Sequence, residues 1–502
     1  MSDTVTLPVS PETFWGLVTL AAVLLAMIAI FGLLSGVKDD AEETPFIRLR
    51  ARLGMAGLPQ GVFALGMILW GAIFAALILG LIWTIISAAF HAPARTQEAQ
   101  TALRFVLISL TALTATLGAV VAFPVTLIRI ALTRKQTETA EEALFNDKVN
   151  AAAGGLAARR QVTRVVGRGA KMQVLTEWED DLVTRASAID RLEGLAKERP
   201  DTAARVARML SIYVRELSRE YPAKEPPEGA STQELREWAA KLTPIRPDME
   251  KAAQSLGRLQ RIDGHDIATG DIDLRHANLQ GFDLGSLNFE NVLFESAEMQ
   301  GAILRDAEMQ GANLRGAEMQ GAILWGAQLQ EAYLVEAQLQ GADLRGAKKQ
   351  GADLMDAKMQ GAILWDAEMQ GAYLWSAEMQ GTHLSGTQMQ GAYIWGAKLQ
   401  GADLSSVQMQ GAYLDSARMN ESTDLNSAIL LGAALRNVNH KTIAQMKAVW
   451  GDIFADGTVQ LPEGEQRPDH WVDEILNQED FHTQWHAWQE TLPDFDSSWR
   501  RG

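Results

Sequence analysis

Two histidines four residues apart come closest to a chemical site in this sequence. His482 and His486 would lie on one face of a helix, a spacing that can bind a metal ion. No third ligand is evident, and Phe481, Trp485 and Trp488 are interleaved with them, which favours packing or an interface. The chain has eight histidines, no cysteine and no glycine-rich phosphate motif. We therefore expect no catalytic, cofactor-binding or metal site, and no enzyme.

The overall composition narrows the class of protein further. The chain has 502 residues, which is long for one compact domain, and its 45 Lys and Arg against 62 Asp and Glu give a net charge of −17. A protein that binds nucleic acid by neutralising phosphates would carry the opposite sign. We expect no direct nucleic-acid binding, although an acidic chain remains compatible with mimicry of nucleic acid.

Three uncharged apolar runs precede every other element, at about residues 14–36, 62–87 and 105–128. Each is longer than the roughly 20 residues that a helix needs to cross a bilayer, and each is apolar on all sides. The runs predict a three-helix membrane anchor over residues 1–132, with no ionisable residue in the middle of any span. The first run could instead be a cleaved signal peptide, but it lacks a basic segment before it.

Basic residues between the runs indicate the orientation. Residues 1–13 contain no Lys or Arg, whereas the first loop contains Lys38, Arg48, Arg50 and Arg52, and three basic residues follow the third run at once. The positive-inside rule places the N-terminus outside and everything after residue 130 in the cytoplasm.

An Ala-, Glu- and Arg-rich region follows and predicts a cytoplasmic helical stalk over residues 133–260. Residues 139–150 continue the third span as a helix until Gly154 and Gly155, and Asp180–Glu198 and Thr202–Glu220 form an antiparallel pair. A basic patch over residues 159–171 could meet anionic lipid headgroups or be a solvated helix face.

A large residue recurs every five positions from residue 272 to 436, and a small residue, usually alanine, stands two places before it. The large positions include Leu274, Leu279, Leu284, Phe289, Phe294 and Met299. Residues spaced five apart would not line up on one side of a helix, and on a strand they would point to opposite faces in turn. The chain must therefore turn a corner every five residues, at positions such as Gly301, Asp306 and Gly311, whose residue types tolerate tight turns. Four corners close a coil of twenty residues.

The units Ala277-Asn278-Leu279-Gln280-Gly281 and Ala342-Asp343-Leu344-Arg345-Gly346 resemble the pentapeptide-repeat family. The resemblance implies a right-handed quadrilateral β-helix, here over residues 270–436. The stalk also resembles that of membrane-anchored bacterial members, which implies a multi-pass protein of the bacterial inner membrane.

Two departures from the pattern stand out. Between Met419 and Leu425 the spacing is six, which predicts one inserted residue at a corner. Lys349 occupies an inward position where Met or Leu is expected. A buried ammonium group is costly, so this amine must snorkel, deprotonate or find a carboxylate. We prefer the interpretation that the coils tolerate this lysine locally over the alternative that the lysine senses a ligand.

Residues twenty apart should stack on the outside of the coils. Glutamines at every tenth position from 300 to 410 would form two ladders that hydrogen-bond from coil to coil. The other two sides carry aromatic rows that we take as the candidate interaction surface. One row comprises Tyr333, Tyr373, Trp375, Tyr393, Trp395 and Tyr413, and the opposite row comprises Trp325 and Trp365 with Arg345 between them. The aromatics could instead simply cover the coil edges.

Residues 437–502 predict a helical cap and tail, with helices at 440–456 and 471–491, which would cover the last coil. We expect a non-enzymatic scaffold, tethered to the bilayer, that presents a rigid cytoplasmic rod to an unidentified cytoplasmic protein or to further copies of itself. The alternative is an acidic mimic of DNA that binds a type II topoisomerase, since residues 271–436 hold 21 carboxylates against 10 basic side chains.

Overall fold

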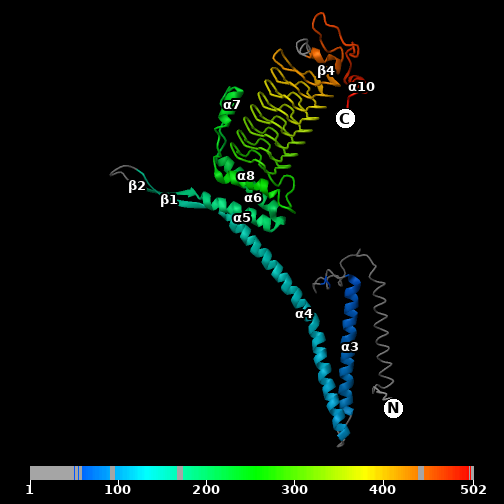
Figure 1. Cartoon of the computed structure of the whole chain (residues 1–502). Coiled ribbons are helices and arrows are strands. Elements are labelled where there is room, and N and C mark those ends of the chain that lie inside the picture. The colour runs from blue at the N-terminus through cyan, green and yellow to red at the C-terminus, as the bar shows by residue number, and fades with distance from the viewer. Residues whose placement is uncertain are drawn as a thin grey trace, which may run out of the picture. The chain divides into compact units, whose positions relative to one another are not determined.

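A computed structural model describes residues 50, 55, 59–90, 97–166, 173–438, 446–496 and 498. The predicted span at residues 14–36 lies outside these residues. The chain consists of two compact units, Met1–Asp147 and Lys148–Gly502 (Figure 1).

The first unit contains helix α3 (Gln60–Phe90) and most of helix α4 (Gln97–Gly155). Both are long and apolar enough to cross a membrane, and they include the runs predicted at residues 62–87 and 105–128. Large apolar side chains on them are exposed, among them Leu79 (66%) and Phe105 (73%). The indole Nε1 of Trp70 on α3 donates a hydrogen bond to the carbonyl oxygen of Val120 on α4 (2.9 Å).

Helix α4 continues without a break past the apolar run and ends at Gly155, as the two adjacent glycines predict. The basic patch that follows is not helical in its described part, Arg159–Val166, which corrects that part of the stalk prediction. It forms strand β1 (Arg159–Val166), which pairs antiparallel with strand β2 (Gln173–Asp180). β1 contains three valines and a threonine, and β2 contains Val174, Thr176 and Trp178, residue types that are common in strands.

Five short helices follow the hairpin: α5 (Leu182–Glu198), η2 (Pro200–Thr202), α6 (Ala203–Glu220), α7 (Thr232–Ala239) and α8 (Pro247–Leu259). The bounds of α5 and α6 match the predicted helix pair to within two residues. Asp181 caps the start of α5 through the amide of Thr184, and Ser231 and Glu234 form a capping box at the start of α7. Ile189, Leu192 and other apolar residues spaced three and four apart on these helices are buried.

The repeat region forms coils of twenty residues. Parallel bridges join one residue in every five to the residue twenty places later, for example Asp283 to Ile303 and Ile303 to Ile323. The predicted corners have the left-handed backbone conformation, with φ of 66° at Gly301 and 54° at Asp306. The recurring large and small residues line the interior, where nearly all are completely buried. The fivefold pattern therefore predicted both the corner positions and the inward-facing residues correctly.

The predicted insertion is also present. After Met419 the bridges join residues twenty-one apart, Asp403 to Asp424 and Gln408 to Ile429. The extra residue lies in a turn in which the Thr423 amide donates to the Asn420 carbonyl oxygen (2.9 Å). The inward register resumes at Leu430, which is fully buried.

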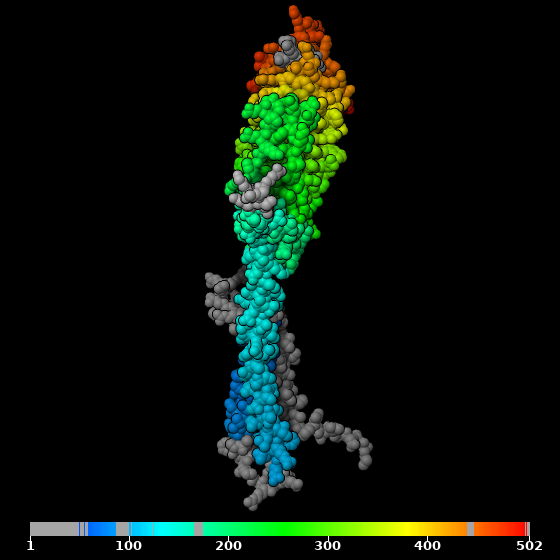
Figure 2. Space-filling model, turned by 90° about the vertical axis from the view of Figure 1, so that its left-hand side faces the viewer, coloured from blue at the N-terminus to red at the C-terminus, as the bar shows by residue number. Residues whose placement is uncertain are grey.

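Helix α7 lies along one corner of the stack, and Figure 2 shows these green residues covering the neighbouring coils. This corner is glycine in every coil that α7 covers, from Gly301 to Gly361. A Cβ atom added at Gly301 would clash with the Ala239 carbonyl oxygen, so a larger residue would displace the helix. Arg236 donates to the carbonyl oxygens of Gly341 (3.1 Å) and Gly361 (3.0 Å).

The C-terminal part departs from the expected helices. Three strands, β3 (Tyr413–Asp415), β4 (Ala433–Arg436) and β5 (Ile453–Ala455), form a parallel sheet in that order. The helix predicted at residues 440–456 is wrong in its described part, because η3 (Lys447–Asp452) is a 3-10 helix and β5 adds to the sheet. The second predicted helix is shorter than expected and spans α10 (Gln478–Gln489).

Candidate interaction surface on the repeat coils

The first aromatic row lies along one side of the coils, as the twentyfold register requires. Tyr373 and Tyr393 are bridge partners whose rings stack with centroids 5.2 Å apart and an angle of 8° between their planes. Two residues further along each coil, Trp375 and Trp395 meet edge to face at 5.9 Å. These four rings thus form a continuous aromatic surface, and Asp353 separates them from Tyr333 in the same column.

Four members of this row are well exposed. The exposed fractions are 57% for Tyr333, 37% for Tyr373, 37% for Trp375 and 44% for Trp395. Tyr393 is half-buried, because it packs against the cluster that forms at the end of the row. Aromatic side chains aligned in this way on a rigid scaffold lose little conformational freedom on binding, which makes them suited to an interface.

Tyr413, the last member of the predicted row, is not part of the open surface. It is 7% exposed and packs against Phe481 and Trp485 of α10, and its ring stacks on the Trp485 ring at 5.7 Å. Burial, with the nearby carboxylate of Asp415, raises the pKa of the Tyr413 hydroxyl. The correction arises because α10 folds back on the coils, a contact that the repeat pattern does not encode.

The opposite row contains Trp325 and Trp365, with exposed fractions of 47% and 43%. The predicted cation–π contact of Arg345 is wrong, because its guanidinium pairs with Asp343 on the same coil (2.6 Å). The contact is made instead by Arg305, whose Cζ lies 5.0 Å from the centre of the Trp325 ring.

The glutamine ladders bond from coil to coil, but along a different path from the one predicted. Gln310 donates to Gln328 Oε1 (3.0 Å), and Gln370 donates to Gln388 Oε1 (2.8 Å). The acceptor is thus the outward residue two places before the next glutamine of the ladder. Glu318 takes the same position and accepts from Gln300 (2.7 Å). These two sides of the coils are therefore cross-linked by their own polar side chains.

Lys349 is completely buried, and its Nζ has no hydrogen-bond partner among the described residues. Burial lowers the pKa of this amine to about 7. The sequence left three outcomes for this amine: it reaches solvent, pairs with a carboxylate or loses its proton. In the described geometry the amine neither reaches solvent nor pairs with a carboxylate. The interior therefore favours the deprotonated amine.

His482 and His486 lie on α10 with ring centroids 6.0 Å apart, and both rings contact Trp485. Burial lowers the pKa of His482, with a further contribution from Arg436. The part of the chain that the structure describes holds no group of three or more His, Asp or Glu side chains that could bind a metal ion. The two histidines take part in the packing of α10.

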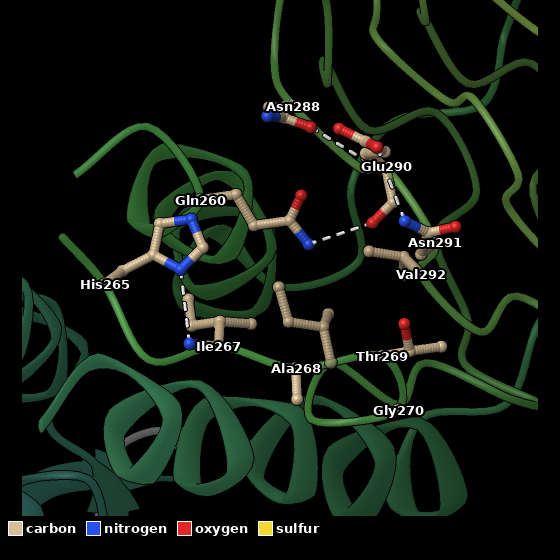
Figure 3. Close-up of a pocket in the computed structure, with 11 residues that line it drawn as sticks. Gln260, His265, Ile267, Ala268, Thr269, Gly270, Asn288, Glu290, Asn291 and Val292 are labelled. Atoms are coloured by element: carbon tan, nitrogen blue, oxygen red, sulfur yellow. Dashed lines mark hydrogen bonds between the residues drawn. The ribbon is translucent and has the colours of Figure 1, made fainter. Parts of the chain in front are cut away.

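A small polar pocket lies between the loop after α8 and the first coils (Figure 3). Its volume is about 240 Å³ and its lining is mostly polar, whereas small-molecule sites are lined mostly by apolar side chains. His265 Nδ1 accepts from the Ile267 amide (3.2 Å), and Gln260 Nε2 donates to the Glu290 carbonyl oxygen (3.2 Å). These side chains thus stabilise the junction of loop and coil.

A buried network in the helical subdomain escaped the sequence patterns. Arg246 contacts Asp248 (2.7 Å) and Asp180 (2.6 Å), and Arg185 pairs with the same Asp180 at the end of β2. Burial alone would raise the pKa of Asp248, but hydrogen bonds from Arg246 and Tyr213 hold it below its ordinary value. The network ties the base of the hairpin to α5, α6 and α8. Its members come from three stretches of the sequence, residues 180–185, 213 and 246–248, and no local spacing relates these stretches to one another.

The coil geometry agrees with the comparison to known families. The family model described as pentapeptide repeats matches the chain in eight copies, over residues 272–311, 312–348, 352–391 and 387–423. No curated protein matches the chain.

Several solved structures resemble the repeat region. HetL, a pentapeptide repeat protein involved in heterocyst differentiation regulation from the cyanobacterium Nostoc, is 22% identical over 40% of this chain and 85% of HetL, with a TM-score of 0.33. QnrB1, a plasmid-mediated fluoroquinolone resistance protein, is 21% identical over 35% of this chain and 92% of its own, with a TM-score of 0.20. A pentapeptide repeat protein from the Arabidopsis thaliana thylakoid lumen is 28% identical over 27% of this chain and 72% of its own, with a TM-score of 0.11.

Proposed function

Because its coils belong to the pentapeptide-repeat family, we propose that this protein is a non-enzymatic, membrane-tethered scaffold whose aromatic row binds another protein. The comparisons indicate no enzymatic family. The observation that carries the proposal is the alignment of exposed aromatic rings from Tyr333 to Trp395 along one side of the coils. The backbone groups of these coils bond to neighbouring coils, so contact with a partner on this side would be made through the outward side chains.

The C-terminal segment suggests what kind of partner fits the row. Helix α10 already covers Tyr413 with Phe481 and Trp485, and the Trp485 indole Nε1 donates to the Gly432 carbonyl oxygen (2.8 Å). A helix with aromatic residues on one face therefore has a complementary surface for this row. We infer that the partner presents an amphipathic, aromatic-bearing helix to the stretch from Tyr333 to Trp395.

Binding can be tested with the full-length protein in detergent micelles. Affinity capture of cytoplasmic proteins by the wild type should be compared with capture by Trp375→Glu and Trp395→Glu. Both side chains point outward, so these variants should keep the thermal stability of the wild type while losing the partner. Lys358→Glu, an exposed position on another side of the coils, is the matched control. An unchanged set of captured proteins in both tryptophan variants would contradict the proposal.

The membrane tether rests on α3 and α4, whose exposed apolar side chains would be unfavourable in water. We propose three spans, including residues 14–36, in a bacterial inner membrane with the N-terminus outside and the coils in the cytoplasm. Because the chain has no cysteine, single introduced thiols report on each side. A membrane-impermeant maleimide added to intact cells should label Ser2→Cys and spare Arg191→Cys. The reverse labelling pattern would overturn the orientation.

The alternative, an acidic mimic of DNA that binds a type II topoisomerase, needs a continuous acidic side. Acidic residues in each outward column are interrupted: Asp343 and Asp403 are separated by Ile363 and His383, and Glu318 and Glu378 by Gln338 and Lys358. Inhibition of topoisomerase supercoiling by micromolar full-length protein would restore this alternative.

A further inference from the structure

The hairpin of β1 and β2 stands away from the helices and coils of its unit (Figure 1). Its strands pair with each other over their full eight residues. The base is held firmly, since Arg185 Nε donates to the Ala158 carbonyl oxygen (3.1 Å) and Arg246 Nη1 lies 2.6 Å from Asp180 Oδ2. The strands thus extend from a fixed base.

Two strands alone form at best a marginally stable sheet in water. Neither β1 nor β2 pairs with any other described strand, so each presents one edge of unpaired backbone groups. Apolar side chains on β2 are exposed as well: Val174 by 66%, Trp178 by 60% and Leu175 by 42%. Neither strand contains proline, and the charged residues that they do contain favour pairing only with a strand of opposite charge. The hairpin therefore has the features of an incomplete sheet.

The two edges carry opposite charge. β1 contains Arg159, Arg160 and Arg164 and no carboxylate, whereas β2 contains Glu177, Glu179 and Asp180 and no basic residue. Like charges directly opposite each other across strands are destabilising, and opposite charges are stabilising. Pairing of β1 with a second β1, or of β2 with a second β2, is therefore disfavoured. The edge complementary to β1 is β2 of another copy.

We propose that the hairpin is a self-association element, in which β1 of one copy pairs with β2 of the next. Within a hairpin β1 and β2 run in opposite directions, so copies related by rotation about an axis along the strands join into one antiparallel sheet. Each interface uses two different edges, and such head-to-tail interfaces close into a ring when the rotation closes. The arrangement covers every free edge and buries Trp178 and its apolar neighbours between copies.

An anionic lipid surface is the competing occupant, because β1 is basic. Two carboxylates of β2, Glu177 and Glu179, lie on the same narrow hairpin and would be repelled by such a surface. Within the hairpin Glu179 already pairs with Arg164 and lies 4.0 Å from Arg160, so the basic residues are not free of counter-charge. A second copy satisfies both strands, whereas lipid satisfies only one.

Charge reversal distinguishes assembly from damage to the hairpin itself. In full-length protein in detergent micelles, Arg160→Glu and Glu179→Arg each place like charges both within the hairpin and between copies. When the two variants are mixed, the contacts between copies become complementary again, whereas the contacts within each hairpin remain repulsive. Mass photometry should therefore show oligomers for the wild type, loss of oligomers for each variant alone, and recovery in the mixture. Failure of the mixture to recover would overturn the proposal.

Disulfide trapping tests the edge pairing directly, because the wild-type chain contributes no thiol. Thr163 and Thr176 lie at the centres of β1 and β2. Oxidation of a mixture of Thr163→Cys and Thr176→Cys chains should give a covalent heterodimer severalfold more abundant than the homodimers of either variant alone. Equal homodimers, or no covalent dimer at all, would contradict pairing of β1 with β2. Protection of these thiols only in nanodiscs that contain anionic lipid would assign the hairpin to the lipid surface instead.

Discussion

Replacing Lys349 by methionine should stabilise the coils. The parallel bridges of Lys348 place Lys349 between Leu329 and Met369 in one inward column. The amine is completely buried without a hydrogen-bond partner among the described residues, and burial lowers its pKa from 10.5 to about 7. Methionine is the residue found one coil away and has a similar length, so it should fill the same space without a polar atom.

The magnitude follows from the pKa. A pKa difference of one between folded and unfolded chain corresponds to about 1.4 kcal/mol, so the change from 10.5 to about 7 corresponds to roughly 5 kcal/mol. This is an upper limit, because a stack of repeats can open locally and admit water at a lower cost than global unfolding. We therefore expect Lys349→Met to raise the free energy of unfolding by about 2–4 kcal/mol at pH 7.

The dependence on pH has a definite sign. The pKa of Lys349 is lower in the folded chain, so between about pH 7 and pH 10.5 the unfolded chain binds a proton that the folded chain lacks. The contribution of this lysine to the free energy of unfolding is therefore least favourable below about pH 7 and improves as the pH rises to 10.5. The gain from Lys349→Met should shrink over the same window.

Urea unfolding of the full-length protein in micelles, followed by circular dichroism at neutral and alkaline pH, measures both effects. Leu329→Met is the matched control, since an apolar exchange in the same column should cost less than about 1.5 kcal/mol and add no pH dependence. A variant less stable than the wild type at pH 7 would show that the amine is satisfied inside the coils. A gain that is equal at both pH values would refute the titration argument.

Three further substitutions test the packing elsewhere. Gly321→Ala should destabilise the protein by roughly 1–3 kcal/mol more than Gly381→Ala in urea unfolding. Both glycines have positive φ, so the backbone strain is the same. A Cβ atom at Gly321 would lie 2.6 Å from a Cβ atom of α7, whereas a Cβ atom at Gly381 would have no atom within 4 Å. Burial would raise the pKa of Glu193, but hydrogen bonds from a neighbouring arginine, lysine and serine lower it to about 2. The stability that Glu193 provides is thus present above about pH 4.5 and lost as the pH falls towards 2, so Glu193→Gln should flatten the acid limb of melting temperature against pH. Trp485→Ala should weaken the packing of α10 on the coils by about 3–5 kcal/mol and expose Tyr413. Limited proteolysis should then cleave the chain after the last coil faster than in the wild type.

The coils were predictable because every position in a five-residue unit has its own physical requirement. A large apolar residue such as Leu304 must face inward, and a residue such as Asp306 must accept a positive φ. These requirements recur in each unit, so the sequence repeats the same information many times. The insertion after Met419 shows how specific the register is, because a single residue moved the bridges from twenty to twenty-one places.

Contacts between distant segments could not be predicted in the same way. Tyr413 and Tyr393 both follow the sequence Gln-Met-Gln-Gly-Ala, yet only Tyr413 is buried beneath α10. Arg345 and Arg305 both lie near a tryptophan in the coil register, and the choice between them depends on an aspartate two residues before Arg345. The hairpin was missed because strands of a two-stranded sheet need no apolar periodicity to pair, and its arginines fit a helix face equally well.

The coils also separate the residues that stabilise the fold from those available for binding. Inward residues and corners are fixed by packing and backbone conformation, and the glutamine sides are cross-linked by their own amides. Outward residues on the two remaining sides make few such contacts, so their identity is not dictated by the fold. Trp375 and Trp395 stand at such positions, where a polar residue such as Ser405 is also accommodated on the opposite side. Substitutions there should alter binding and leave stability unchanged, whereas substitutions at inward positions such as Lys349 should do the reverse.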